Sequence, residues 1–287
     1  MSFEITTAFV EQYSRNIILS HQQKESKLRG AVRVETGIVG KNAFFDAVSA
    51  TAAVKRTTRH ADTPLVSTPH TRRRVTLADF DWADLIDDLD RVKMLADPTS
   101  VYIQNAVAAF NRSIDDEIIA AFLATAYGGV DGSTSYTFDT SGFQIAVAST
   151  GLTLSKLLAA KQKLDAQEVP EEDRHIVIGS KQLQDLLNVT EVKSSDFNTV
   201  KALVQGDIDT YLGFKFHKSE RLAVASSVRS CIAWHRDSLL LGIGQDIKTR
   251  VSERADKNYA IQPYACMSIG AVRMDQVGVV QIDCLEA

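Results

Sequence analysis

Hydrophobic side chains recur every three or four residues between positions 98 and 127, which predicts one long helix. Six positions share this spacing: Ile103, Val107, Phe110, Ile114, Ile118 and Phe122. Asp97-Pro98 is a typical helix start, because Asp accepts hydrogen bonds from first-turn N–H groups and Pro has no N–H to leave unpaired. Gly128-Gly129 marks the end. A helix of about 30 residues is about 45 Å long, so we expect it to be the backbone of a layer of the molecule.

The segment 30–76 alternates hydrophobic and polar residues at its two ends only. Val32 and Val34 alternate at the start, and Val75 and Leu77 alternate at the end. Between them lie glycines, small residues and prolines. This pattern predicts two strands joined by a long excursion, which is a hairpin rather than a domain.

The remainder of the chain mixes helical and strand patterns. Residues 131–149 are rich in Gly, Ser and Thr and predict a loop or hairpin. Helical spacing then recurs around Leu154–Leu164, Leu183–Leu187 and Phe197–Val204, with a short apolar strand at 176–178. From residue 211 the chain is strand-like, at 214–216, 231–234, 239–243, 247–251, 259–265 and 277–282. The fold class is therefore α+β.

Composition and charge exclude several classes of protein. The 287 residues include 45% hydrophobic and 24% charged residues, which is ordinary for a globular protein. With 32 basic and 36 acidic residues the net charge is −4, so the chain as a whole is not a basic nucleic-acid binder. Three cysteines without a CxxC pair argue against a disulfide framework or zinc site. No apolar run is long enough to cross a membrane and no signal peptide is evident, which predicts a soluble protein.

Two blocks of opposite charge follow one another in the chain. The basic block lies in the excursion and comprises Lys55, Arg56, Arg59, Arg72, Arg73 and Arg74, against the single acid Asp62. The acidic block follows directly and comprises Asp79, Asp81, Asp84, Asp87, Asp88 and Asp90. The basic block has three interpretations: a grip on nucleic acid, a solubilising loop, or an arm that docks on an acidic face of another subunit. A hairpin cannot easily fold back onto the residues that directly follow it, so we favour docking between copies, with the acidic block as acceptor.

No pattern of residues predicts catalysis, a metal or a cofactor. The six histidines are scattered, the acidic block lacks the glycine and terminal glutamate of a calcium loop, and Gly242-Ile243-Gly244 lacks the rest of a dinucleotide fingerprint. Lys181 and Asp185 are the best enzymatic candidates, but their spacing is typical of a surface ion pair on a helix. We therefore predict no catalytic, cofactor-binding or metal-binding residues.

The order of these segments, together with local sequence, resembles a known family. The segment Gly206–Ser219, GDIDTYLGFKFHKS, is similar to a glycine, apolar, glycine-phenylalanine and serine pattern in the major capsid protein of tailed bacteriophages, which has the Hong Kong 97-like fold. The residues Val169-Pro170, Arg174, Ile176–Ile178, Leu186-Leu187 and Ala233–Arg236 are also similar to that family's axial domain. The resemblance covers essentially the whole chain.

The resemblance implies a layout of arm, loop and two domains. Residues 1–29 would form an N-terminal arm and 30–76 the extended loop. Residues 77–130 and 247–275 would form the peripheral domain with its spine helix, and 131–246 and 276–287 the axial domain. In the family, the extended loop lies over the peripheral domain of a neighbouring subunit, in agreement with the charge argument.

The resemblance also implies the function. The chain would be a major capsid protein that assembles as hexamers and pentamers into an icosahedral shell around double-stranded DNA, without enzymatic activity or membrane contact. It would be assembled in the host bacterial cytoplasm with a portal. No coiled-coil segment precedes the arm, so either a separate scaffolding protein is needed or such a segment has been removed. The alternatives are a shell protein of a cellular nanocompartment with the same fold, or a soluble α+β enzyme.

Overall fold

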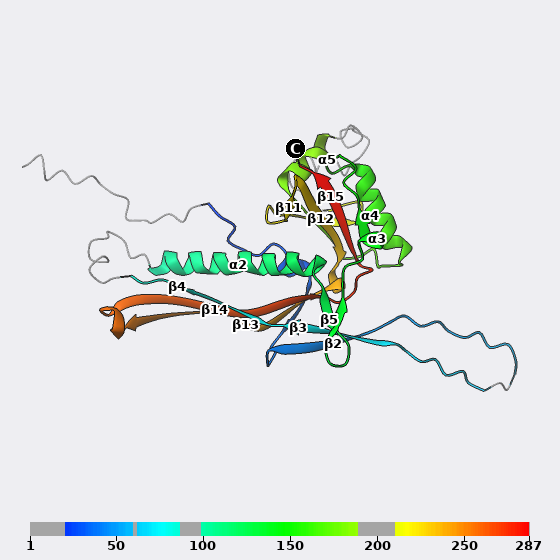
Figure 1. Cartoon of the computed structure of the whole chain (residues 1–287), viewed down its shortest axis with the longest axis horizontal. Helices are drawn as coiled ribbons and strands as arrows, with labels where there is room; N and C mark the ends of the chain where they lie inside the picture. Colours follow the sequence, from blue (N-terminus) through cyan, green and yellow to red (C-terminus); the bar gives the residue numbers. More distant parts are fainter. Residues whose placement is uncertain (1–20, 60–61, 87–98, 189–209, 287) are drawn as a thin grey trace, which may run out of the picture. The chain divides into compact units, whose positions relative to one another are not determined.

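The computed structural model describes residues 21–59, 62–86, 99–188 and 210–286 (Figure 1). These residues divide into two compact units. The described part of unit 1 consists of residues 21–25, 79–86, 99–112 and 246–267. The described part of unit 2 consists of residues 26–59, 62–78, 113–188, 210–245 and 268–286.

The predicted long helix is present and is shorter than expected. Helix α2 spans Thr99–Leu123, and Phe110 on its apolar face is buried, at 4% exposure. The prediction that the helix continues to residue 127 was wrong, because strand β5 occupies Ala126–Gly128. Tyr127 and Gly128 pair there with Arg74 and Arg73, and these ladder hydrogen bonds replace further helical ones.

A four-stranded sheet has the order β1-β13-β14-β4. Its strands are β1 (Arg33–Thr36), β13 (Leu239–Arg254), β14 (Ala260–Arg273) and β4 (Ala78–Ala83). The sequence predicted two separate strands at 239–243 and 247–251, whereas β13 is continuous through both. The strand around Val34 pairs in parallel with β13, at Val34 and Leu241, and is therefore not part of the predicted hairpin.

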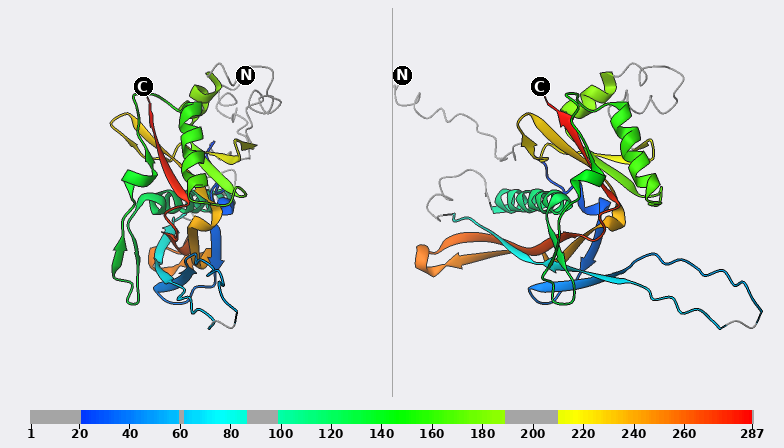
Figure 2. Two further views of the ribbon diagram at one scale, coloured as in Figure 1. Left: turned by 90° about the vertical axis from the view of Figure 1, so that its right-hand side faces the viewer. Right: turned by 45° about the vertical axis from the view of Figure 1, so that its right-hand side comes forward.

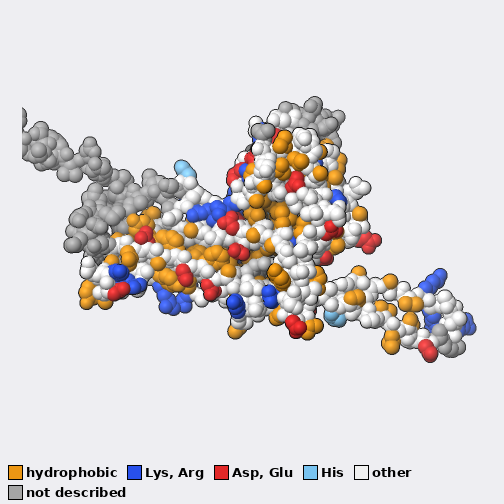
Figure 3. All heavy atoms as spheres, in the orientation of Figure 1, with side chains coloured by type: hydrophobic (Ala, Val, Ile, Leu, Met, Phe, Trp, Pro, Cys, Tyr) orange, Lys and Arg blue, Asp and Glu red, His pale blue; other side chains and the backbone are white. Residues whose placement is uncertain are grey.

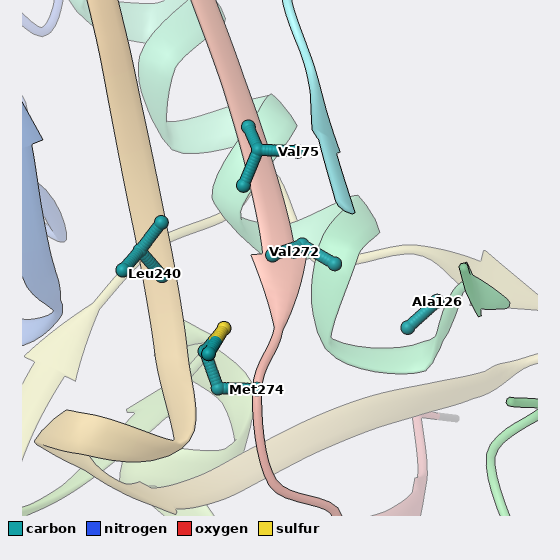
Figure 4. Packing of buried hydrophobic residues seen from close by; sticks show 5 residues of the cluster. All are labelled: Val75, Ala126, Leu240, Val272 and Met274. Carbon is teal, nitrogen blue, oxygen red and sulfur yellow. The ribbon is translucent and has the colours of Figure 1, made fainter. Parts of the chain in front are cut away.

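The hairpin forms instead from the next strand along the chain. β2 (Asn42–Val48) and β3 (His70–Thr76) are antiparallel from Asn42 opposite Thr76 to Val48 opposite His70. With β5 and β6 (Thr134–Tyr136) they form a sheet in the order β2-β3-β5-β6. One face of this sheet covers a hydrophobic cluster (Figure 4), whose buried members are Val75, Ala126, Leu240, Val272 and Met274.

The third sheet contains the predicted α/β section and lies entirely in unit 2. Its order is β7-β15-β12-β8-β10-β9, with β11 paired to β12. These strands are β7 (Gln144–Ile145), β8 (Arg174–Ile178), β9 (Thr210–Tyr211), β10 (Phe214–Lys218), β11 (Val224–Ala225), β12 (Val228–His235) and β15 (Val279–Leu285). Every residue of β8 is buried, as expected for a central strand.

Helices accompany this third sheet. Helix α4 (Leu154–Ala166) contacts β15 (Figure 2), and α5 (Ser180–Asn188) follows β8. Short turns of helix complete the structure: η2 (Arg29–Ala31), α3 (Thr140–Phe143), η3 (Arg236–Ser238) and η4 (Ala255–Lys257). The helices predicted around Leu154 and Leu183 are confirmed, and the one predicted at 197–204 lies outside the described residues.

Candidate assembly surface

The long excursion between β2 and β3 is an extended loop, residues 49–69. At its base the Ser49 N–H donates to the Pro69 carbonyl at 3.0 Å. Beyond this bond its described residues form no helix or strand, and they are exposed. Lys55, Arg56 and Arg59 lie on the outgoing arm, 49–59. Figure 3 shows basic and hydrophobic side chains along this loop, and Leu65 is 99% exposed.

The other three predicted basic residues lie on β3 and have partners within the sheet. Arg72 forms an ion pair with Asp46 on β2 at 2.6 Å, and this hydrogen bond lowers the pKa of Asp46. The Arg73 guanidinium lies 3.6 Å from the centroid of the Tyr136 ring, a cation–π contact. The basic block therefore has two parts, an exposed group on the loop and an arginine row on β3.

Arg74, the third arginine of this row, also faces an aromatic ring. Its guanidinium lies 5.3 Å from the centroid of Tyr127 on β5. The sequence did not predict these aromatic partners. Tyr127 and Tyr136 follow Arg74 only after α2, so no local spacing signals the contact.

Three residues of the predicted acidic acceptor, Asp79, Asp81 and Asp84, lie within the described residues. Asp79 and Asp81 are exposed on β4, and the Asp81 carboxylate accepts a hydrogen bond from Tyr264 Oη at 2.5 Å. Asp84 follows β4, and its N–H donates to the Pro263 carbonyl at 3.2 Å. Asp87, Asp88 and Asp90 lie outside the described residues. The described acceptor residues belong to unit 1, whereas the extended loop belongs to unit 2.

A buried carboxylate on α2 holds the chain that precedes β1. Asp115 is fully buried, and its oxygens accept hydrogen bonds from Ser26 Oγ at 2.6 Å and from the Lys27 and Leu28 N–H groups at 3.2 Å each. This bonding fixes residues 26–28 against the helix. This contact could not be predicted from the sequence, because Asp115 and its partners are 87 to 89 residues apart and such a pairing leaves no periodic pattern.

Two histidines that are scattered in the sequence meet in the third sheet. His175 Nδ1 on β8 lies 3.0 Å from His217 Nε2 on β10, because these parallel strands are neighbours. Both rings stack on Trp234 of β12, with centroids 5.7 and 6.0 Å from its ring. Burial is the main cause that lowers the pKa of both groups, that of His175 to about 4.

A buried lysine in the first turn of α4 was also not predicted. Lys156 is 5% exposed, and its ammonium donates to the carbonyl oxygens of Val147, Thr150, Gly151 and Asp283 at 2.8 to 3.0 Å. Burial lowers its pKa. Four backbone acceptors compensate the lost hydration of the ammonium, so Lys156 fastens the loop before α4 to β15.

The enzymatic candidates have structural explanations. Lys181 Nζ lies 3.6 Å from Asp185 Oδ1, the expected pair along one helix. Cys231 and Cys284 are buried and Cys266 is partly buried, and none is in a disulfide. Among the described residues no group of three or more His, Cys, Asp or Glu side chains is placed to hold a metal ion. No helix in the described ranges has the length and apolar character needed to span a membrane.

Comparisons with known proteins agree with this architecture. The family described as phage capsid protein matches residues 5–286. A search of curated proteins found no match. Among solved structures, the capsid of cyanophage P-SCSP1u is similar with a TM-score of 0.77 at 17% identity, covering 99% of this chain and 95% of that one.

Two further solved structures have the same fold at lower identity. The capsid of Ralstonia phage GP4 has a TM-score of 0.74 at 12% identity, with 97% of this chain and 96% of that chain covered. The head of Helicobacter pylori bacteriophage KHP40 has a TM-score of 0.74 at 9% identity, with 99% of this chain and 98% of that chain covered.

The mixed helix and sheet architecture is consistent with the Hong Kong 97-like fold. Neither the nanocompartment nor the enzyme alternative is favoured. The chain belongs to the phage capsid protein family and is a major capsid protein, a structural component of the virion rather than an enzyme.

Proposed function

We propose that this capsid protein assembles as hexamers and pentamers into an icosahedral shell that encloses double-stranded DNA. Membership of the capsid family and full-length likeness to capsid folds support a shell of many copies. The main structural support for contacts between copies is the extended loop, which is too exposed to be stabilised by contacts within its own chain.

The loop exposes hydrophobic side chains as well as unpaired backbone. Leu65 is 99% exposed, Val54 60% and Val66 48%, and the described residues between Ser49 and Pro69 have no ladder partner. Unpaired extended backbone and grouped apolar side chains favour contact with another chain. We infer that a second copy of this protein covers the loop.

Charge identifies the acceptor on that second copy. Lys55, Arg56 and Arg59 are exposed on the loop, and Asp79 and Asp81 are exposed on β4. We propose that these groups meet between copies, with Asp84, Asp87 and Asp88 extending the acidic acceptor. The arginines on β3, Arg72 to Arg74, have partners in their own sheet, so we assign them to positioning the base of the loop within this contact.

The division into domains follows from the same proposal. Residues 1–29 would be the N-terminal arm, and 30–76 the extended-loop segment, which comprises the loop 49–69 and the strands on either side of it. Residues 77–130 and 247–275 would be the peripheral domain, and 131–246 with 276–287 the axial domain. Residues 79–86, 99–112 and 247–267 of the proposed peripheral domain lie in unit 1, which supports the division. Residues 113–130 and 268–275 lie in unit 2, and residues 21–25 of the proposed arm lie in unit 1, so the two divisions agree in part.

Reversal of the loop charges tests the contact between copies. Lys55→Glu, Arg56→Glu and Arg59→Glu together would abolish shell assembly and leave the subunit folded, because these side chains are exposed. Lys41→Glu, an exposed base in the turn between β1 and β2, is the control and would leave assembly unchanged. Normal shells from the triple variant, seen by sedimentation and negative-stain microscopy, would contradict the proposed docking.

We further propose that assembly takes place in the host bacterial cytoplasm with a separate scaffolding protein and a portal, and that DNA is held by non-specific contacts. Co-expression with candidate scaffold genes would raise the yield of closed particles. Nuclease treatment of particles from infected cells would leave a protected genome. Particles that enclose protein cargo and no DNA would favour the nanocompartment alternative.

A further inference from the structure

The first strand of the hairpin, β2, is an edge strand of its sheet. The order β2-β3-β5-β6 places β3 on one side of β2, and no described residue pairs with its other side. All four strands lie in unit 2 (Figure 1). Edge strands are usually protected by lysine, proline or a bulge, because their unpaired N–H and C=O groups recruit other strands. The sequence of β2, NAFFDAV, has no lysine or proline, and its pairing with β3 is continuous.

Alternate residues of β2 direct their backbone groups to the open edge. The Leu77 N–H donates to the Lys41 carbonyl at 2.9 Å, and the Ser49 N–H donates to the Pro69 carbonyl at 3.0 Å. Odd-numbered residues of β2 are therefore the ones bonded to β3, because bonded and non-bonded pairs alternate along an antiparallel ladder. The even-numbered residues direct their N–H and C=O groups outward, and all of them are exposed: Asn42, Phe44, Asp46 and Val48.

Most side chains of β2 are apolar on both faces of the sheet. Phe45 and Ala47 pack against the hydrophobic cluster, and Phe44 and Val48 on the other face are 41% and 61% exposed. The one charged residue, Asp46, forms an ion pair with Arg72 in its own sheet. An apolar, charge-balanced edge favours the addition of another strand.

The sequence of β2 is complementary to itself in one antiparallel register. When Phe45 lies opposite Phe45 of a second copy, all seven residues of the strand are paired. The other pairs are then Asn42 with Val48, Ala43 with Ala47, and Phe44 with Asp46. A shift of the second copy by two residues leaves only 42–46 or 44–48 paired. The shift that pairs 44–48 also places two Asp46 carboxylates opposite each other, which is unfavourable.

Arg72 supports the same register. Its Nε and Nη2 donate to Asp46 at 2.6 and 3.3 Å, and its guanidinium lies 5.6 Å from the centroid of the Phe44 ring. In the self-complementary register, Asp46 of the second copy lies directly opposite Phe44 and hence beside this guanidinium. Nη1 has no acceptor in the part of the chain that the structure describes, so it can donate to that second carboxylate.

We propose that the β2 strands of two copies pair antiparallel across a two-fold axis, with Phe45 opposite Phe45, and join their two sheets into one. This inference rests on the proposed shell function, because two-fold axes relate copies in a closed symmetric assembly. It involves the strand at the base of the extended loop and not the loop itself. One strand edge is a small interface, so we expect the pairing in assembled particles and no stable free dimer.

Cysteine pairs in assembled particles test the register. Cys266 is partly buried and would first be replaced as Cys266→Ser. Particles that mix copies carrying Ala43→Cys with copies carrying Ala47→Cys would give disulfide-linked dimers on oxidation with oxidised glutathione. These two residues would face each other in a non-bonded pair, whose Cα atoms are about 4.5 Å apart, a distance that a disulfide spans. Both substitutions add little volume, so the subunit keeps its fold.

Particles with only one of the two substitutions are the control. Residue 43 of one copy lies four positions from residue 43 of the other, about 13 Å along the strands, and the same holds for residue 47. Neither single variant would therefore form dimers, and dimers from one of them would overturn the register. Wild-type particles without dimers in the mixed sample would overturn the pairing. Failure of the wild-type protein to form particles would instead overturn the proposed shell function.

A backbone substitution tests the pairing without cysteine. The Phe44 N–H points to the open edge, so Phe44→Pro removes a donor between copies and no bond to β3. Phe44→Ala is the matched control, because it loses the same ring and keeps the N–H. We expect Phe44→Pro to lower the yield of sedimenting particles about tenfold relative to Phe44→Ala, while urea denaturation shows that both subunits are folded. Equal particle yields from the two variants would overturn the proposal.

Discussion

The Leu28 N–H donates a hydrogen bond to Asp115 Oδ1 at 3.2 Å, and both residues are fully buried. Ser26 and Lys27 bond to the same carboxylate. A few residues later, the Ala31 carbonyl accepts from Trp234 Nε1 at 2.9 Å. The chain before β1 is thus bonded both to α2 and to the third sheet, and it cannot move independently of them.

Removal of the Asp115 carboxylate would destabilise the protein. Asp115→Ala leaves the Lys27 and Leu28 N–H groups without an acceptor, and we expect the free energy of unfolding to fall by about 2 to 4 kcal/mol. Urea denaturation measures this change. Asp116→Ala is the control on the same helix, because Asp116 forms an exposed ion pair with Arg221, and such pairs contribute less than about 1 kcal/mol. Equal losses in the two variants would contradict the role of Asp115.

The histidine pair predicts that stability falls in mild acid. The pKa of His175 is about 4 in the folded protein and about 6.5 in an unfolded chain. Between these values the unfolded state binds more protons, so the free energy of unfolding decreases as the pH falls from about 6.5 to about 4, by about 2 to 3 kcal/mol. The charged groups that act on the pair are Asp173, Lys215 and Arg236 around His175, and Asp115 and Lys215 around His217.

Denaturation midpoints measured at several pH values test this prediction. His175→Gln would flatten the profile between pH 6.5 and 4, even if the variant is less stable throughout. His70→Gln, at an exposed position on β3, would keep the wild-type slope. A wild-type slope in the His175 variant would show that the acid sensitivity lies elsewhere.

Truncation of a buried side chain on the apolar face of α2 would lower the free energy of unfolding strongly. Phe110 is 4% exposed, and Phe110→Ala would cost about 3 to 5 kcal/mol, the usual range for removal of a buried aromatic side chain. Val251→Ala, at a position that is 51% exposed, would change stability by about 0.5 kcal/mol or less. An unchanged denaturation midpoint for Phe110→Ala would mean that Phe110 faces solvent.

Arg273 caps the C-terminal end of α2. Its guanidinium donates to the carbonyl oxygens of Phe122 and Ala124, which the helix end leaves free, and to the Tyr136 carbonyl on β6. Burial lowers its pKa to about 10, so it stays protonated at neutral pH. Arg273→Met would keep the apolar volume, lose these bonds and cost about 3 kcal/mol.

The matched control for Arg273 is Arg33→Met, because Arg33 is exposed and pairs with its neighbour Glu35. This variant would change stability by less than about 1 kcal/mol. Urea denaturation midpoints of Arg273→Met and Arg33→Met measure the two changes in stability. A midpoint of Arg273→Met that equals the wild-type value would contradict the capping role.

Periodic features of this fold could be predicted from sequence. The stripe through Phe110 and Phe122 identified α2, and the apolar run 176–178 identified β8. The end of α2 could not be predicted, because Ala126 to Gly128 join β3, a strand formed far earlier in the chain. The prediction that the strand around Val34 pairs with the strand around Val75 was wrong for the same reason. β1 pairs with β13, which lies far along the chain.

The charge pattern predicted which residues form the candidate contact surface. It did not predict how these residues are arranged within the fold. Exposure of Lys55 and Asp79 agrees with their polar sequence context. The row of arginines on β3 could not be distinguished from the loop bases by sequence, because the tyrosines that face Arg73 and Arg74 come from β5 and β6. Long-range pairs such as His175 and His217 become visible only when the strand order is known.

The mass and shape of the purified protein test the central claim most directly. Light scattering with negative-stain microscopy, with and without co-expressed candidate scaffold genes, would show megadalton shells or rings of five or six subunits. A uniform 31.5 kDa monomer under every condition, with scaffold included, would contradict assembly into a shell.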